Sequence, residues 1–250
     1  MRPAVAKHFE GKRLPLIMAH KGGTAYGPEN AAETVRRALA HKHKPDIIEV
    51  DVRKSRDGVL YCHHGSIPFG VFFATFFGLF SFRTIMRLVG PRDTLRDVLA
   101  AIPEGTLVYL DLKDPWITAA DLAPLISGRA GVWVAPYWWI PQLLKHLRTE
   151  LGDAHAYAFT RPVFFPRRMA KKLEGSIDFI RFFRWGWSRR VIDTIEGHNI
   201  ACHMVEWFIS RKRYVASLPL SRYQGLFFSV YNLADAAELH AARNRILPNI

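Results

Sequence analysis

Short apolar runs alternate along the chain with segments in which apolar residues recur at helical spacing. Eight runs have the length and the β-branched and aromatic content of strands: 15–20, 46–52, 106–113, 131–139, 154–160, 176–184, 199–207 and 225–232. Segments with helical signals follow them, several beginning at Asn, Asp or Ser or with Pro in the first turn: 30–42, 93–102, 119–127, 140–151, 167–175, 189–197, 210–218 and 234–246. Eight strands that are each followed by a helix predict a parallel β/α architecture.

The number of strands distinguishes between two parallel architectures. Eight strands close a (β/α)₈ barrel, and 250 residues is the usual size of that fold. A doubly wound open sheet is the alternative, but the chain has no glycine-rich dinucleotide-binding turn to support it. We therefore expect an α/β protein with a single TIM barrel over residues 1–250. A hydrophobic insertion follows the second predicted strand, at about residues 66–92.

Polar residues gather where the predicted strands end. His20 ends the first strand, and Glu49 and Asp51 end the second. Asp111 and Lys113 end the third. Residues two apart on a strand share a face, and barrel enzymes carry their active residues at the carboxyl ends of the strands. We therefore expect these side chains to converge at one end of the barrel.

The three carboxylates among these residues predict a metal site. Carboxylates held close together repel one another unless a cation or a shared proton intervenes. Glu49, Asp51 and Asp111 would suit one hard divalent cation with oxygen ligands, Mg²⁺ or Ca²⁺. Surface salt bridges are the alternative for a single carboxylate pair, and the third carboxylate from another strand favours the metal.

Histidines close to the same strand end could move protons. A turn at residues 57–58 precedes a second extended run that ends in His63 and His64. Phosphodiester cleavage needs one group to deprotonate the nucleophile and another to protonate the leaving oxygen, and histidine can do either. Lys21 and Lys113 would neutralise the phosphate. The chain has no G-x-S-x-G nucleophile elbow, so nothing indicates Ser/His/Asp chemistry.

In this order, the motifs resemble those of the glycerophosphodiester phosphodiesterase family. The matching stretches are AHKGG at 19–23, PEN at 28–30, IEVDV at 48–52, DG at 57–58 with His64 seven residues beyond Asp57, and LDLK at 110–113. The close resemblance covers about the first 115 residues, and the rest agrees in its alternation of strands and helices. It implies a (β/α)₈ barrel, in agreement with the strand count.

The resemblance also implies roles for individual residues. His20 and His64 match the general acid and base. Glu49 and Asp51 match metal ligands, and Asp111 falls on a further ligand position that usually carries Glu.

Two more residues match family positions, and two depart from them. Lys113 matches the lysine near the phosphate, and Glu29 lies at a position that shapes the first loop or supports the metal site from outside its direct ligands. Lys21 replaces an arginine, which keeps the charge but loses the bidentate phosphate contact. Gly65 replaces an aspartate, and HMVE at 203–206 stands where the family has Trp-Thr-Val-Asn. These changes leave the acid–base residues in place and bear on the substrate.

The predicted insertion is strongly aromatic. Residues 67–82 carry no charge and include seven phenylalanines. Sixteen helical residues would reach about 24 Å, short of the ~30 Å hydrocarbon core of a bilayer, so a membrane-spanning helix is not expected. One interpretation is a helix packed inside the protein. The other is a hydrophobic lip beside the active site, which would contact an anionic membrane or an acyl chain through Phe69, Phe72, Phe73, Phe76, Phe77 and Phe80.

Charge and cysteine content limit the classes of binding partner and the cellular compartment that we expect. The net charge of +13 fits nucleic acid, an anionic membrane, an anionic substrate or a solvated basic surface. No zinc-finger spacing, aromatic RNA-binding motif or long basic tail is present, so we expect no nucleic-acid partner. Two cysteines cannot build a disulfide framework, and the N-terminus lacks an apolar stretch of signal-peptide length. These features favour the cytoplasm, with peripheral membrane attachment as an option.

The function predicted is metal-dependent hydrolysis of glycerophosphodiesters or lysophospholipid-like phosphodiesters, with His20 and His64 as the acid–base pair. The small-molecule or lipid substrate and one divalent cation are the expected partners. A phospholipase C- or D-like enzyme on a membrane lipid is one alternative. Another is a catalytically weak lipid-binding module, with Lys21 and Gly65 as signs of lost activity. A basic nucleic-acid binder ranks last.

Overall fold

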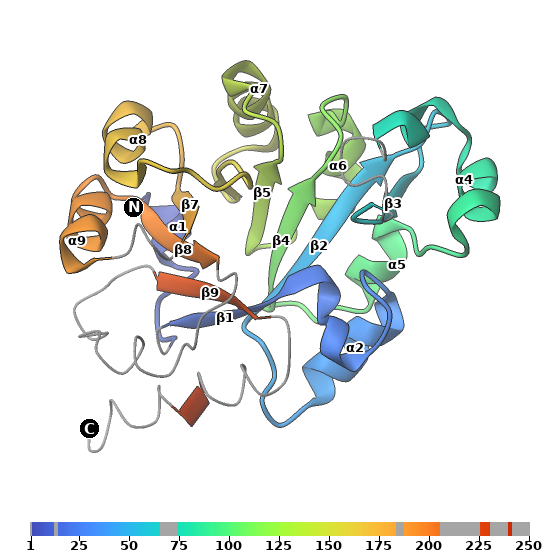
Figure 1. Ribbon diagram of the computed structural model, residues 1–250, viewed down its shortest axis with the longest axis horizontal. Helices are drawn as coiled ribbons and strands as arrows, with labels where there is room; N and C mark the ends of the chain where they lie inside the picture. The colour runs from blue at the N-terminus through green and yellow to red at the C-terminus, as the bar shows by residue number, and fades with distance from the viewer. Residues whose placement is uncertain are drawn as a thin grey trace.

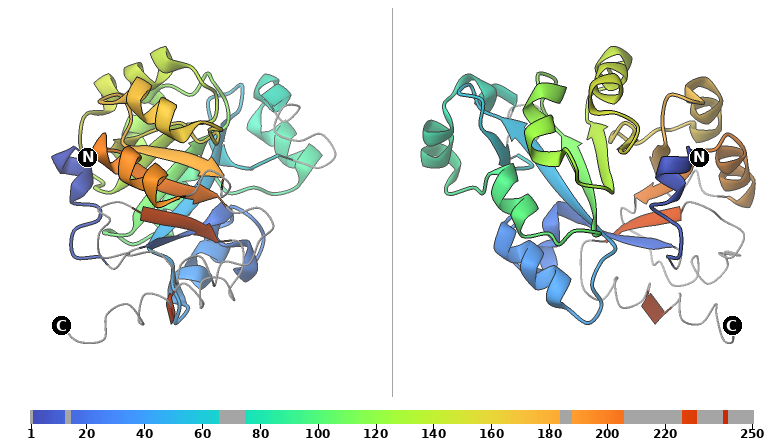
Figure 2. Two further views of the ribbon diagram at one scale, coloured as in Figure 1. Left: turned by 60° about the vertical axis from the view of Figure 1, so that its left-hand side comes forward. Right: turned by 180° about the vertical axis from the view of Figure 1, so that it is seen from behind.

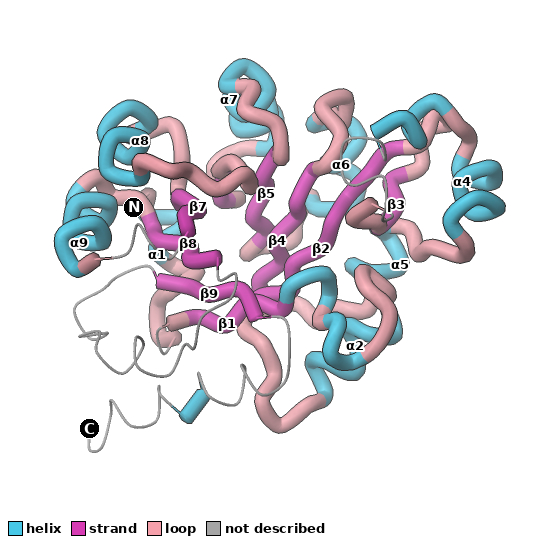
Figure 3. The backbone as a smooth tube through the Cα atoms, viewed as in Figure 1, coloured by secondary structure: helices cyan, strands magenta, loops and turns pink. Residues whose placement is uncertain are grey.

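Eight parallel strands form the centre of the fold. The computed structural model describes residues 2–12, 15–65, 75–183, 188–205, 226–230 and 240–241. Each predicted strand is present, and all but β2, which runs two residues beyond 46–52, lie within their expected segments: β1 Leu16–Ala19, β2 Ile47–Lys54, β4 Leu107–Leu112, β5 Val132–Pro136, β6 Ala156–Tyr157, β7 Phe179–Phe183, β8 Ala201–Val205 and β9 Leu226–Val230. They lie side by side in the order β6-β5-β4-β2-β1-β9-β8-β7, with the helices outside them (Figures 1 and 3).

The two ends of this strand order meet through β6 and β7. The Asp178 N–H donates to the Tyr157 carbonyl at 2.7 Å, and the Tyr157 N–H donates to Asp178 Oδ2 at 2.8 Å. Beyond β6, Val163 forms a parallel bridge with Phe182 of β7. These contacts join the strands that an open doubly wound sheet would leave as free edges, so the arrangement is a barrel.

The helices begin where the capping residues predict. The bounds are α1 Pro3–Ala6, α2 Ala32–Ala40, α4 Phe82–Val89, α5 Leu95–Ala100, α6 Ala119–Ile126, α7 Pro141–Leu151, α8 Pro166–Leu173 and α9 Arg189–Gly197. Pro141 and Pro166 occupy first turns, and the Ser188 side chain accepts from the Val191 N–H at the start of α9. The short α1 was not predicted. The predicted helices at 210–218 and 234–246 lie outside the described residues, apart from residues 240–241.

Aromatic side chains fill the amino end of the barrel. Tyr109 of β4 and Trp133 of β5 are paired in register and buried, and Phe179 of β7 packs against both rings. His8, beyond α1, covers this layer and accepts a hydrogen bond from Trp133 Nε1 at 2.8 Å. Two residues further along β4, Asp111 begins the polar layer of the carboxyl end.

A hairpin and an insertion modify the barrel at β2. As the sequence predicted, β3 (Leu60–Cys62) returns antiparallel to β2 after the turn at Asp57–Gly58. The described part of the insertion is the 3₁₀ helix η3 (Thr75–Leu79) followed by α4. The teal α4 stands at the edge of the molecule in both views of Figure 2.

The aromatic segment 67–82 is not one continuous helix in its described part, residues 75–82. Ser81 is extended, and its side chain accepts from the Thr84 N–H, so a new helix begins there. Phe69, Phe72 and Phe73 lie outside the described residues. No helix in the described ranges has both the length and the apolar character needed to cross a bilayer.

Candidate active site

Three carboxylates from two strands meet at the carboxyl end of the barrel. Glu49 and Asp51 come from β2 and Asp111 from β4, with Asp51 and Asp111 directly paired in register. Each offers an oxygen that lies within 4.8 Å of the others, and all three side chains are buried. Glu49 Oε1 and Asp111 Oδ1 are buried oxygens that find no hydrogen-bond partner among the described residues. The predicted convergence is therefore present, and the arrangement is suited to a cation.

Lys113 is the direct counter-ion of the cluster. Its Nζ lies 2.8 Å from Asp51 Oδ1 and 2.5 Å from Asp111 Oδ2. Burial alone would lower the pKa of Lys113, but Asp111, Asp51 and Glu49 outweigh it and raise that pKa. Burial would raise the pKa of Asp51, but Lys113 and nearby histidines hold it below its usual range.

The single ammonium of Lys113 does not balance the negative charge around Glu49. Burial raises its pKa well above the usual range, and the charges of Asp51 and Asp111 raise it further. Three carboxylates exceed the charge of Lys113, and their donor atoms are all hard oxygens. A divalent cation fits this donor set and would balance its charge.

His20 enters the site where β1 ends. It begins the 3₁₀ turn η1 (His20–Gly22), is 7% exposed, and places Nε2 3.9 Å from Glu49 Oε1. Burial lowers its pKa well below the usual range, which favours the neutral imidazole. Lys21 follows in the left-handed region at φ 52°, and its N–H donates to Glu49 Oε2. The turn thus directs both the imidazole and a backbone donor toward the carboxylates.

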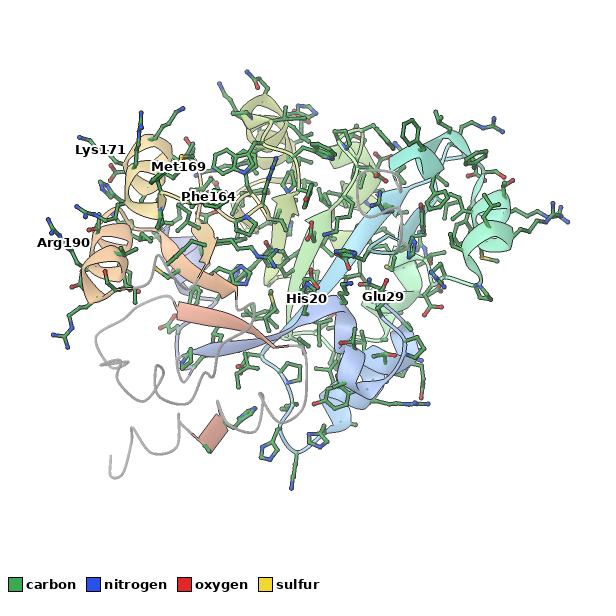
Figure 4. All side chains as sticks on the ribbon, in the orientation of Figure 1. His20, Glu29, Phe164, Met169, Lys171 and Arg190 are labelled. Carbon is green, nitrogen blue, oxygen red and sulfur yellow. The ribbon has the colours of Figure 1, made fainter. Side chains whose placement is uncertain are left out.

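The Pro-Glu-Asn motif supports both sides of this turn. Glu29 Oε2 accepts from Lys21 Nζ at 2.9 Å, so the lysine in the family's arginine position is paired with a carboxylate. Asn30, also left-handed at φ 59°, donates to Asp51 Oδ2 at 2.8 Å and accepts from the Asp51 N–H at 3.0 Å. His20 and Glu29 lie near each other in Figure 4, where β1 leads into its loop. Asn30 was not predicted, although it belongs to the motif that named Glu29.

The β2–β3 hairpin returns His64 to the level of the carboxylates. The His63 N–H donates to the Asp51 carbonyl at 3.0 Å, which fixes the chain just before His64. Burial lowers the pKa of the half-buried His64 to about 4, although Asp51 opposes the shift. Asp51 interacts electrostatically with both His20 and His64, so the two predicted acid–base residues share one carboxylate neighbour.

A fully buried arginine positions this histidine pair. Arg53 donates through Nε to the His63 carbonyl at 3.1 Å and through Nη2 to the His64 carbonyl at 2.9 Å. Its Nη1 pairs with Asp114 at 2.6 Å, and Asp114 also accepts from the Lys54 N–H. Sequence reasoning missed Arg53, although period-two alternation places it on the face of Glu49 and Asp51.

A second buried arginine was also missed. Arg181 of β7 is 6% exposed, and its Nη1 donates to the Thr160 carbonyl at 3.2 Å. Burial raises the pKa of Asp111 and the charge of Arg181 opposes that rise, while it adds to the burial-driven lowering of the pKa of His20, so Arg181 lies on the same interior face. The sequence signal for it was an arginine inside an apolar strand. Two buried arginines therefore accompany Lys113 in the described part of this end of the barrel.

The described part of the predicted hydrophobic lip contacts the loop that carries His63 and His64. The Phe77 ring lies 6.4 Å from the His63 ring, and Phe77 is half-buried. Phe76 and Phe80 are 54% and 41% exposed. Packing inside the protein therefore does not account for these two side chains.

Part of the chain matches a known protein family. A profile of the Glycerophosphoryl diester phosphodiesterase family matches residues 20–69, which contain the motifs around His20, Asp51 and His64. Glycerophosphodiester phosphodiesterase GDPD6 of Arabidopsis thaliana is 41% identical over 66 residues, which are 25% of this chain and 17% of that protein. The chain thus matches about a sixth of the length of this curated relative.

Solved structures share the fold over nearly the whole chain. A glycerophosphodiester phosphodiesterase from Agrobacterium tumefaciens is 18% identical with a TM-score of 0.64, covering 92% of this chain and 99% of that one. A phosphodiesterase from Oleispira antarctica, solved with the product sn-glycerol-3-phosphate, is 18% identical with a TM-score of 0.63, covering 96% and 99%. An enzyme of the same type from Thermotoga maritima is 15% identical with a TM-score of 0.63, covering 90% and 96%. These likenesses confirm the predicted barrel.

Proposed function

We propose that the chain is a member of the glycerophosphoryl diester phosphodiesterase family and that it hydrolyses glycerophosphodiesters in a reaction that requires a divalent cation. The observation that carries the proposal is the convergence of Glu49, Asp51 and Asp111 beside His20 and Lys113 in one buried cluster. The product named for the Oleispira antarctica structure, sn-glycerol-3-phosphate, supports the same class of substrate.

In this proposal His20 and His64 divide the proton transfers. Burial favours the neutral form of both imidazoles, so either can accept a proton from the nucleophile. The negative charge of a bound phosphodiester favours the protonated form of the imidazole nearest to it, which could then protonate the leaving oxygen. The nucleophile is water or a neighbouring hydroxyl of the substrate, and the second option releases a cyclic phosphate first.

Glu49, Asp51 and Asp111 would hold the cation, Mg²⁺ or Ca²⁺, through carboxylate oxygens. When bound, such an ion polarises the phosphate and lowers the pKa of the nucleophile. Lys113 would steady the negative charge that develops in the transition state, because its ammonium already lies at the cluster. Lys21 would add charge at the rim, and Glu29 orients it through their ion pair.

Lipid-like phosphodiesters are a second candidate substrate class. The exposed Phe76 and Phe80 lie in the insertion beside the catalytic loop, and they favour a substrate with an acyl chain, such as a lysophospholipid. Cleavage of the other P–O bond, as in phospholipase C- or D-like enzymes, is the related alternative.

A substrate panel with product analysis tests the proposal. Glycerophosphocholine, lysophosphatidylcholine and a chromogenic phosphodiester would be incubated with Mg²⁺, Ca²⁺ or EDTA, and the products identified by ³¹P NMR. We expect turnover with a divalent cation, its loss in EDTA, and release of glycerol phosphate from glycerophosphocholine. Turnover that persists in EDTA would contradict the metal site. No turnover of any substrate would favour the lipid-binding module.

A further inference from the structure

Exposed apolar side chains are concentrated at the end of the barrel that carries the active site. Every large hydrophobic residue that the structure describes as exposed lies in a connection that leaves the carboxyl end of the barrel: Phe76, Leu79, Phe80, Met86, Leu88, Trp116, Ile140, Phe164 and Phe165. We call these residues the apolar rim. Exposed large hydrophobic residues that share one end of a barrel in this way indicate an interaction site.

The insertion part of the rim is held firmly against the hairpin. The Arg56 N–H, at the hairpin tip, donates to the Phe80 carbonyl at 2.9 Å. Gly78 lies directly on the Trp116 ring, since a Cβ at this glycine would approach the ring to 2.2 Å. Leu79, the next residue, is nevertheless 64% exposed. Leu79 is therefore exposed although the backbone on both sides of it is packed against the hairpin and Trp116.

The second part of the rim lies between β6 and α8. Phe164 and Phe165 are 64% and 73% exposed. A cavity of about 660 Å³ opens beside them between α8 and α9, and its lining includes Arg167, Arg168 and Lys171. Figure 4 shows Phe164, Met169, Lys171 and Arg190 together on this side of the molecule, away from the labelled His20 and Glu29.

Basic side chains predominate around the rim. Exposed arginines of the same connections and of the helices that they contain or lead into include Arg83, Arg87, Arg161, Arg167 and Arg168. In the described residues of the connections that carry the rim, the acidic side chains are Asp57, Asp93 and Asp114. Asp57 is exposed and accepts from the Phe82 N–H at 2.8 Å. Asp93 accepts from the Ala32 N–H, and Asp114 is buried with Arg53.

We propose that the carboxyl end of the barrel docks on the surface of an anionic lipid bilayer. The apolar rim would enter the boundary between headgroups and acyl chains, and the arginines beside it would contact anionic headgroups. The excess of basic side chains beside the rim and the net charge of +13 favour an anionic bilayer over a protein partner with mixed charges. Docking itself does not depend on the proposed function. The inference rests on that function only in stating what docking achieves, which is to bring the acid–base site to phosphodiesters at a lipid surface.

Co-sedimentation with vesicles tests the docking surface. Protein in EDTA would be mixed with vesicles of phosphatidylcholine alone or with added phosphatidylserine, so binding is measured without turnover. We expect binding that requires phosphatidylserine, weakened about tenfold in Phe164→Ser/Phe165→Ser or Leu79→Ser/Phe80→Ser. Far-UV circular dichroism and thermal unfolding would establish that each variant is folded.

A matched pair of charge reversals separates docking from general attraction. Arg167→Glu/Arg168→Glu changes the rim, and Lys42→Glu/Lys44→Glu makes the same change in net charge at exposed residues of the amino end. The first variant should lose phosphatidylserine binding and the second should keep it. Equal loss in both, no vesicle binding by the wild type, or binding insensitive to both apolar double variants would overturn the proposal. Self-association through the rim without vesicle binding would also overturn it, in favour of a second copy of the chain.

Discussion

The two ends of the barrel bury polar groups in opposite ways. At the carboxyl end, Glu49, Asp51 and Asp111 face one another with Lys113 as their direct counter-ion. At the amino end, Trp133 lies among apolar neighbours and its indole N–H has a partner in His8. Crowded like charges oppose folding, whereas a satisfied buried aromatic ring favours it. We therefore expect substitutions at the carboxyl end to change metal binding and catalysis, and substitutions at the amino end to change the stability of the fold.

The largest effect is expected from His64→Ala, with His63→Ala as the adjacent control. Loss of a general acid or base lowers kcat by about 10²–10⁴. His63 contacts Arg92 and the Phe77 ring instead, so its replacement should cost less than about tenfold in kcat. Steady-state kinetics on glycerophosphocholine would measure both. Equal losses in the two variants would contradict the assignment of His64.

Arg53→Met should affect stability and catalysis together. It leaves Asp114 buried without its partner, which costs about 3–5 kcal/mol in the free energy of unfolding. Denaturant unfolding measures that loss, and kinetics measures the accompanying fall in kcat.

The double variant Arg53→Met/Asp114→Asn separates the two contributions. Asn can still accept from the Lys54 N–H, so most of the stability should return. The His63 and His64 carbonyls would still lack their donor, and kcat should remain low with little change in KM. If kcat recovered with stability, the positioning role of Arg53 would be wrong.

Trp133→Phe should affect stability alone. The change removes the indole N–H that donates to His8 and part of a fully buried ring, which costs about 1–3 kcal/mol in the free energy of unfolding. Turnover per folded molecule should stay within about twofold, because the ring lies in the layer below Asp111. A large fall in turnover would show that the two ends are not independent.

The smallest effect concerns pH. Burial lowers the pKa of His8 to about 4, against about 6.5 when unfolded. The unfolded chain then binds a proton that the folded chain excludes, so stability is complete above pH 6.5 and falls as the pH drops toward 4. Between pH 7 and 5, the slope of the unfolding free energy against pH reports the number of protons taken up on unfolding, and in His8→Asn that number should fall by up to about one. An unchanged slope would contradict this role.

The sequence was most informative where local pattern decides structure. Alternation located β2 and placed Glu49 and Asp51 on one face, and the Asp57–Gly58 turn predicted the return of the chain through β3. The order of motifs then brought His20, His64 and the carboxylates together in the prediction. Their convergence needed only the rule that parallel strands end at one edge.

The parts that escaped prediction depend on distant partners. Arg53 is buried because Asp114, 61 residues away, neutralises it, and no local pattern encodes that pairing. His8 matters through Trp133, 125 residues away. The start of α4 inside the aromatic run 67–82 was also not predicted, and the Ser81 side chain caps it there.

Metal-dependent thermal unfolding tests the contrast between the two ends most directly. Mg²⁺ or Ca²⁺ should raise the unfolding midpoint of the wild type, because a ligand of the folded state stabilises it. Trp133→Phe should unfold at a lower temperature and show the same rise. Glu49→Gln keeps an acceptor for the Lys21 N–H but removes the carboxylate whose ionised form is most disfavoured by burial and by its acidic neighbours. Without metal, this variant should therefore unfold at a higher temperature than the wild type. Adding metal should raise its midpoint little further. A metal-induced rise in Glu49→Gln equal to that of the wild type would contradict the carboxylate cluster as the metal site.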